Sequence, residues 1–231
     1  MKAGLLLCDH INDKYKKEFG DYDHFFAKLF PEFDFVFYDV CNGRFPENID
    51  ECDFYLTTGS KYSTYENIDW MLKMKTLVQT FYQKEKCFIG CCFGHQLMAE
   101  ALGGKVQKSD KGWCVGVHQF EIKAQENWMI PFQSELNLLM MCQDQVLELP
   151  KDSKVLAGNE KCPNGIIQIG KRMLGIQGHP EFSKSYDELL IKDRVERIGE
   201  EDVKIGLDSL SKEVHQKTIH DWIINFIKAG R

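Results

Sequence analysis

The sequence contains no long hydrophobic run. No segment reaches the roughly 18 consecutive apolar residues that a membrane helix needs, and residues 1–13 turn polar too early for a secretory signal. We therefore expect a cytoplasmic protein with no membrane partner. Low-complexity segments and linkers rich in proline, glycine or serine are also missing, which predicts that residues 1–231 fold as a single domain.

Concentrated positive charge is missing as well. The formal net charge is -6 at pH 7, and 29 lysines and arginines are scattered among 35 acidic residues. Phosphate backbones bind clustered lysine and arginine, so this distribution disfavours a nucleic-acid partner. The nine cysteines show no regular spacing and no paired zinc-ribbon motif, which predicts free thiols and no metal site.

What is present is an alternation of short apolar runs with amphipathic segments. Strands are predicted at 2–8, 33–40, 53–59, 86–91, 115–122, 135–142, 154–159, 165–170 and 172–178. Helices are predicted at 21–30, 66–84 and 94–102 and near the C-terminus, and the buried face of the second is expected to contain Ile68, Met71, Leu72, Leu77 and Val78. The predicted fold class is α/β, with a doubly wound, mostly parallel sheet and an additional antiparallel β section.

The run "GCCFG" at residues 90–94 joins one of these strands to a helix. It matches a nucleophile elbow, in which the reactive residue is at the tip of a sharp turn between two glycines. The glycines are needed because a β-carbon there would collide with the packed strand and helix. Centring the pattern on Gly90 and Gly94 selects Cys92 as the nucleophile and leaves Cys91 as a packed strand thiol. The alternative is a tight turn without a catalytic role.

A thiol nucleophile needs a base, and the base needs a group that orients it. The run "GHPEF" supplies His179 and Glu181, which are expected two residues apart in extended chain with both side chains on one side. The amino end of the helix after Cys92 favours a thiolate, and the N–H of Phe93 can face a developing oxyanion. These residues predict a Cys-His-Glu triad.

The other histidines are weaker candidates for the base. His95 follows the turn on the helix and cannot easily reach back to Cys92, and His118 lies in a predicted strand without a neighbouring acid. The remaining four are expected at the surface: His10, His24, His215 and His220.

Together, "GCCFGHQ" and the downstream "HPE" resemble the class I glutamine amidotransferase family, most clearly over residues 58–182. The resemblance implies a flavodoxin-like fold, a small-molecule γ-glutamyl substrate and no cofactor. It further implies that Cys92 forms a thioester with the γ-glutamyl group, that His179 carries the proton, and that Glu181 holds His179.

The resemblance also implies roles for binding residues. Gly59, in the loop "TTGS", would join Phe93 around the oxyanion, and Gln96 would help to hold the substrate. The chain departs from the family pattern at Ser60, where many relatives have a second glycine, and at Cys142, where a histidine is usual. The segments "TGSKYSTYE" and "QGHPEF" are most similar to the corresponding segments of stand-alone GMP-synthase-like amidotransferases and γ-glutamyl peptidases.

Three functional hypotheses follow. The sequence has no Walker-type phosphate loop, because "LGGKV" lacks the upstream glycine and the serine or threonine of that motif. Members of the family that make a product pass ammonia to a synthase, so we expect either a separate synthase subunit or hydrolysis as the function itself. The favoured hypothesis is a stand-alone hydrolase of a γ-glutamyl amide bond, in glutamine or a γ-glutamyl peptide. The alternatives are a glutaminase subunit that delivers ammonia to a separate synthase subunit, and a non-catalytic binding module. The presence of Cys92, His179 and Glu181 favours an enzyme.

Overall fold

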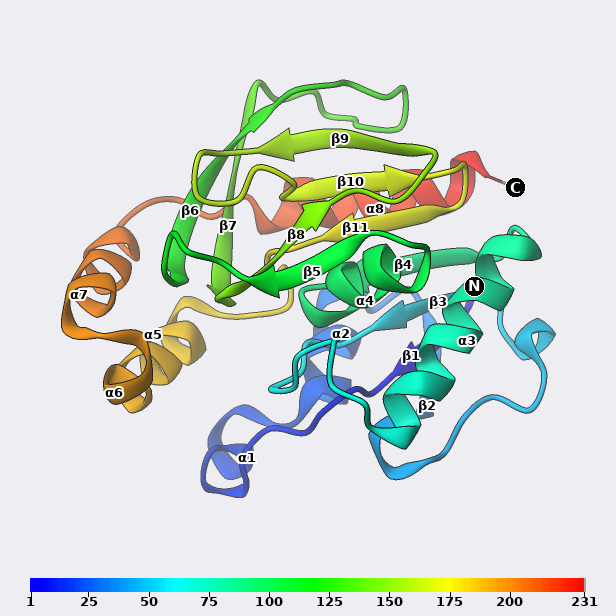
Figure 1. The fold of residues 1–231 in the computed structure, drawn as a ribbon, viewed down its shortest axis with the longest axis horizontal. Coiled ribbons are helices and arrows are strands. Elements are labelled where there is room, and N and C mark those ends of the chain that lie inside the picture. The colour runs from blue at the N-terminus through cyan, green and yellow to red at the C-terminus, as the bar shows by residue number, and fades with distance from the viewer. Residues whose placement is uncertain (231) are drawn as a thin grey trace.

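The computed structural model describes residues 1–230 (Figure 1). The strands are β1 (Lys2–Leu6), β2 (Asp34–Tyr38), β3 (Phe54–Thr57), β4 (Cys87–Cys91), β5 (Lys105–Lys108), β6 (Cys114–Ile122), β7 (Glu135–Cys142), β8 (Asp144–Glu148), β9 (Ser153–Gly158), β10 (Ile166–Ile169) and β11 (Met173–Ile176). The α-helices are α1 (Asp13–Phe19), α2 (Tyr22–Leu29), α3 (Asp69–Gln83), α4 (Phe93–Ala101), α5 (Lys184–Asp193), α6 (Val195–Ile198), α7 (Glu200–Ser209) and α8 (Gln216–Ala229). Two short 3-10 helices, η1 (Val40–Asn42) and η2 (Ile49–Glu51), precede β3.

Nine strands form one sheet in the order β2-β1-β3-β4-β11-β10-β9-β6-β7. The strands from β2 to β11 pair in parallel, and those from β11 to β7 pair antiparallel. The parallel part has the flavodoxin-like order, in which the chain direction across the sheet reverses beside β1. β5 and β8 form a separate antiparallel pair. The predicted fold class is confirmed.

Helices cover both faces of this sheet (Figure 1). Successive residues of a strand point to opposite faces, so Leu5 of β1 lies in the same core as Phe26 of α2 and Trp222 of α8. Leu6, its neighbour, lies in the other core with Met74 of α3 and residues of α4. The parallel strands are therefore buried on both sides, as their nearly continuous apolar runs predict.

The buried face of α3 differs from the predicted one. Met71 and Val78 are buried as predicted, but Leu72 is 46% exposed and Leu77 is half-buried. The residues buried on this helix are Trp70, Met71, Met74, Val78 and Phe81. At 3.6 residues per turn this set forms one stripe, whereas Leu72 falls on the opposite side.

Several elements were not predicted, among them α1, α5 to α7 and the β5–β8 pair. α1 has no buried residue and α6 is four residues long, so neither carries a clear apolar period. No helix in the described part of the chain is both long and apolar enough to cross a membrane. Because strands from both halves of the chain share one sheet, we propose that the protein folds as a single domain.

Candidate active site

The carboxyl ends of the parallel strands gather the predicted residues at one edge of the sheet. Gly59 lies just beyond β3, Cys92 follows β4 directly, and His179 lies three residues after β11. In open α/β sheets, ligands bind at this edge. The topology therefore brings together residues that are far apart in the sequence.

Cys92 is at the tip of a strained turn. Its φ of 47° and ψ of -99° place a non-glycine residue in a conformation that L-residues rarely adopt. A β-carbon on Gly90 would lie 2.5 Å from the carbonyl carbon of Gly94, and one on Gly94 would lie 1.6 Å from Oγ1 of Thr57. The steric reason given for both glycines is confirmed, and the turn has the geometry of a nucleophile elbow.

The two adjacent cysteines have different surroundings. Cys92 is the N-cap of α4 and lines two neighbouring cavities. Cys91 is the last residue of β4, is 1% exposed and lines neither cavity. Burial, with smaller contributions from the charges of Glu181 and Cys92, raises the pKa of the Cys91 thiol well above its ordinary value. Cys91 therefore remains a protonated, packed thiol.

The imidazole of His179 is held on three sides. Its Nδ1 lies 2.8 Å from Oε1 of Glu181, and because a carboxylate only accepts, this nitrogen carries the proton. The ring of Phe182 stacks on the imidazole with a centroid distance of 3.9 Å and an interplanar angle of 8°. On another side, a β-carbon on Gly59 would lie 2.9 Å from Cε1 of His179. This packing fixes the ring and leaves Nε2 for the thiol.

Electrostatics favours the charged form of this histidine. Burial alone lowers the pKa of His179, but the charges of Cys92 and Glu181 and hydrogen bonds to both side chains raise it well above its ordinary value. An imidazolium beside a sulfur atom stabilises the thiolate form of that sulfur. The arrangement can therefore supply a nucleophile at Cys92 and a proton donor at His179.

The segment that carries the base is not extended as predicted. Pro180 and Glu181 form a turn, and the N–H of Phe182 donates to the carbonyl of His179 at 3.4 Å. Proline has a fixed φ that suits the second position of such a turn. The two side chains still meet, but the turn brings them together rather than the period of a strand.

The loop after β3 is tied to the end of β1. Ser60 Oγ donates to the carbonyl of Cys8 at 3.0 Å, and Thr58 Oγ1 accepts from the N–H of Cys8 at 2.9 Å. Ser60 therefore anchors the loop through its hydroxyl. Within residues 1–230, the backbone N–H groups of Gly59 and Phe93 donate to no other residue.

Two cavities meet at Cys92. The larger, of about 300 Å³, is also lined by His179 and by aromatic side chains of α1, α2 and α5. The smaller, of about 210 Å³, is also lined by Gln96 and Asp144. The residues common to both walls are Ser60, Lys61, Cys92, Met141, Arg194 and Arg197.

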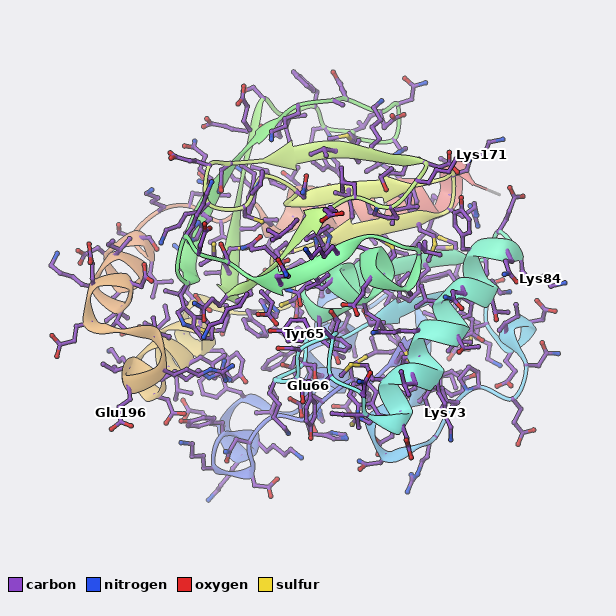
Figure 2. All side chains as sticks on the ribbon, in the orientation of Figure 1. Tyr65, Glu66, Lys73, Lys84, Lys171 and Glu196 are labelled. Atoms are coloured by element: carbon purple, nitrogen blue, oxygen red, sulfur yellow. The ribbon has the colours of Figure 1, made fainter. Side chains whose placement is uncertain are left out.

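Gln96 lies in the wall of the smaller cavity, but its amide is bound to the protein. Its Nε2 donates to the carbonyl of Asp144 at 2.8 Å and to Oε1 of Gln177 at 3.2 Å. Gln177 in turn donates to Sγ of Cys92 at 3.7 Å. In the same wall, the hydroxyl of Tyr65, which Figure 2 labels, donates to Oδ1 of Asp144 at 3.2 Å. Gln177 was not predicted, although it lies two residues before His179.

Cys142, the other departure from the family pattern, also lines the smaller cavity. It is paired in register with Cys114 of the neighbouring strand, and Gln145 donates to Sγ of Cys114 at 3.4 Å. A hydrogen bond with Cys114 and burial raise the pKa of Cys142 well above its ordinary value. Cys142 therefore contributes a neutral thiol to the wall.

Two further histidines are neutral: His95 is buried and His118 is half-buried. His95 packs against Gly175, and burial lowers its pKa to about 4. Burial likewise lowers the pKa of His118 to about 4. Of the four expected at the surface, His24 is exposed, whereas His215 and His220 are half-buried.

His10 differs from the expectation of a surface residue, because it is half-buried and lines the larger cavity. Its Nδ1 lies 2.8 Å from Asp21 and its Nε2 lies 3.1 Å from Asp39. Burial lowers its pKa, but hydrogen bonds to these carboxylates raise it overall. His10, Asp39 and Cys41 hold potential ligand atoms within 4.8 Å of one another. A protonated His10 with both nitrogens engaged is a poor metal ligand, so this cluster is better described as an ion-pair network.

Six further charged residues of the cavity walls were not predicted: Asp9, Lys61, Lys108, Asp193, Arg194 and Arg197. Asp9 comes shortly after β1, so its place at the carboxyl end of a predicted strand could have identified it. Arg194 and Arg197 lie in and beside α6, and no local pattern indicates that this segment folds over the sheet edge.

Known proteins are similar to this chain in sequence and in fold. Residues 61–197 match the family model "Glutamine amidotransferase class-I". Gamma-glutamyl peptidase 3 of Arabidopsis thaliana is 31% identical over 190 residues, 78% of this chain and 76% of that protein. A glutamine-hydrolyzing GMP synthase of Porphyromonas gingivalis is 27% identical over 62% of this chain and 27% of its own length.

A glutamine amidotransferase structure from Thermotoga maritima has a TM-score of 0.79 and 19% identity, and the superposition covers 98% of both chains, which shows a common fold. The matched family segment contains the elbow and the His-Pro-Glu turn. The chain belongs to the class I glutamine amidotransferase family.

Proposed function

We propose that this protein is a stand-alone hydrolase that cleaves the γ-glutamyl amide bond of a γ-glutamyl peptide or of glutamine. The observation that carries the proposal is the placement of Cys92 at a strained elbow between two cavities, beside a His179 whose Nδ1 is 2.8 Å from Glu181. The γ-glutamyl peptidase among its relatives supports hydrolysis as the function.

In the first step, the thiolate of Cys92 attacks the γ-carbonyl carbon of the substrate. The carbonyl oxygen gains negative charge, and the N–H groups of Gly59 and Phe93 are the donors proposed to stabilise it. The carbon–nitrogen bond then breaks as Nε2 of His179 gives its proton to the leaving nitrogen. The products are a free amine and a γ-glutamyl thioester on Cys92.

In the second step, water attacks the thioester carbonyl while His179 accepts one of its protons. The carbon–sulfur bond breaks, glutamate is released, and Cys92 and His179 return to their starting state. Glu181 touches no substrate atom in this scheme. It holds the tautomer and orientation of His179 and stabilises the imidazolium.

The two cavities suit the two halves of the substrate. His179 lines only the larger cavity, and because it protonates the leaving nitrogen, the leaving group belongs there. The smaller cavity presents Asp144 and Lys108, which match the amino and carboxylate groups of a glutamyl head. A leaving-group cavity of about 300 Å³ is far larger than ammonia needs, given that one water molecule occupies about 30 Å³ of liquid. This supports a γ-glutamyl peptide over glutamine.

The second candidate is a glutaminase subunit that passes ammonia to a separate synthase, and the match to a GMP synthase favours it. The test measures amine and glutamate release from a γ-glutamyl dipeptide and ammonia release from glutamine, with Cys92→Ala as the control. We expect the isolated protein to hydrolyse the peptide and the control to be inactive. Glutaminase activity that appears only with a co-purified synthase would instead establish the second candidate.

Alkylation distinguishes an enzyme from a non-catalytic binding module. At mildly acidic pH a thiol of ordinary pKa, about 8.5, reacts little with iodoacetamide, whereas a thiolate paired with an imidazolium reacts fast. Cys41 is the matched internal reference, because it is more exposed than Cys92 while burial and Asp39 raise its pKa to about 12. Preferential labelling of Cys92 is expected, and labelling that follows exposure would contradict a catalytic thiolate.

The nine cysteines are all free, which is the state expected in a reducing compartment. We therefore keep the cytoplasm as the proposed location.

A further inference from the structure

Most charged side chains in the wall of the larger cavity are already paired. Nζ of Lys61 lies 2.8 Å from Oδ1 of Asp9, and His10 lies between two carboxylates. Asp193 is bound to Nζ of Lys14 at 2.6 Å. Because these charges are compensated within the protein, they offer little net attraction to a charged substrate group.

Arg194 and Arg197 are different. Within residues 1–230, neither guanidinium takes part in an ion pair or a hydrogen bond. Arg197 lies over the indole of Trp113, with Cζ 5.1 Å from the ring centroid, and Trp113 belongs to the smaller cavity. Arg194 is half-buried in the wall of the larger cavity. Arg197 lines the larger cavity too, but it is exposed and its guanidinium lies on Trp113, so among the described residues Arg194 is the half-buried cation of that wall without a partner.

The backbone holds Arg194 in place where α5 ends and α6 begins. Its N–H donates to the carbonyl of Ile191 at 3.4 Å, and its own carbonyl accepts from Ile198 at 2.9 Å. Its positive charge partly offsets the rise that burial causes in the pKa values of Tyr22 and Tyr186, which line the same cavity. Glu196, on the same short helix, is exposed and projects away from the molecule at the outer edge of Figure 2. The turn therefore directs a cation toward the cavity and an acid toward solvent.

We infer that Arg194 binds the carboxylate of the leaving group, so that the preferred substrates are γ-glutamyl peptides with a free C-terminal carboxylate. The inference rests on the proposed hydrolysis, and it names the substrate class for that site. A guanidinium presents paired N–H donors that match a carboxylate, and this pairing is stronger than a neutral hydrogen bond. Arg194 lines both cavities, and in the larger one it shares the wall with His179, on the side from which the amine leaves. The aromatic side chains of this wall can contact the rest of the leaving residue.

The test compares three substrates: a γ-glutamyl dipeptide, the same dipeptide with its C-terminus amidated, and glutamine. The proteins are the wild type, Arg194→Gln, Arg194→Lys and Arg44→Gln. Arg44 is the matched control, because it is exposed, its side chain makes no ion pair or hydrogen bond within the described residues, and it lines neither cavity. Thermal unfolding of each variant checks that the fold is intact.

For the wild type, kcat/KM should be about 10-fold higher for the acid than for the amide, the size expected for one hydrogen-bonded charge pair. Arg194→Gln should abolish this preference, because it should lower kcat/KM for the acid about 10-fold more than for the amide or for glutamine. Arg194→Lys should retain part of the preference, and Arg44→Gln all of it.

Other outcomes overturn the inference in distinguishable ways. Equal wild-type rates on the acid and the amide, or an equal loss on all three substrates in Arg194→Gln, would remove the role of Arg194 and leave γ-glutamyl hydrolysis intact. Turnover of glutamine alone would remove peptide hydrolysis, and the inference with it. No turnover of any substrate would remove the proposed function itself.

Discussion

Replacing Glu181 with glutamine removes one negative charge and keeps the size of the side chain. The Glu181 side chain is 0% exposed, and its Oε1 is 2.8 Å from Nδ1 of His179. A hydrogen bond to a charged group contributes about 1.5–3 kcal/mol. Because this hydrogen bond stabilises the His179 imidazolium in the proposed scheme, its loss should lower kcat/KM by about 10- to 100-fold. The amide can also turn its NH₂ toward Nδ1 and favour the unproductive tautomer, which acts in the same direction.

The same substitution should move the pH profile. Burial lowers the pKa of His179, but Cys92 and Glu181 together raise it well above its ordinary value of 6.5. The alkaline limb of kcat/KM, where the imidazolium loses the proton needed by the leaving group, should therefore lie well above pH 6.5 in the wild type. Without the Glu181 charge the imidazolium is less stable, so this limb should shift to lower pH.

The assay measures kcat/KM for a γ-glutamyl dipeptide across the pH range, for the wild type, Glu181→Gln and Glu188→Gln. Glu188 is the matched control, because its side chain on α5 is 46% exposed and its partner is Lys192. Its substitution should change neither rate nor profile. A Glu181→Gln enzyme with wild-type rate and an unmoved alkaline limb would refute the assignment of Glu181 as the group that orients His179.

Two further predictions concern the elbow. Gly94→Ala should lower the free energy of unfolding, measured by thermal unfolding, by about 1–2 kcal/mol. The added β-carbon would lie 1.6 Å from Oγ1 of Thr57, and this clash should outweigh the roughly 1 kcal/mol by which alanine favours a helix over glycine. Adding Thr57→Ala should restore part of it, and unchanged stability in Gly94→Ala would contradict the close approach of Thr57 as the reason for glycine. Cys91→Ala should keep kcat/KM within about threefold of wild type and lower the free energy of unfolding by about 1 kcal/mol, because it removes only a packed sulfur atom. Inactivation of a folded Cys91→Ala protein would show that Cys91, not Cys92, is the nucleophile.

Local sequence patterns were sufficient for much of the fold and for the core of the candidate site. The apolar runs located the parallel strands because strands buried on both faces are continuously hydrophobic. The glycines around Cys92 identified the elbow because close packing there excludes a β-carbon, and this constraint is local. The pair of His179 and Glu181 was also local, although it forms through a turn rather than an extended segment.

Other parts of the site depend on distant contacts. Gln177 donates to the sulfur of Cys92 across 85 positions of sequence, and Gly59 packs against His179 only because β3 and β11 flank β4. The short, charged α6 has no apolar period from which its position in the fold could be predicted. Its placement determines that Arg194 faces the cavity.

The sequence by itself identified the residues proposed to carry the chemistry, because each of two local patterns is encoded within a few positions: the elbow with its glycines at 90–94, and the histidine with its acid at 179–181. Only the tertiary structure decided how a substrate would be recognised. Both cavities are lined by segments that lie far apart in the sequence and come together at the carboxyl ends of the strands. Ion pairs between these segments compensate most charges of the larger cavity and leave Arg194 unpaired within residues 1–230. The net charge available to a substrate therefore depends on how all of these segments pack.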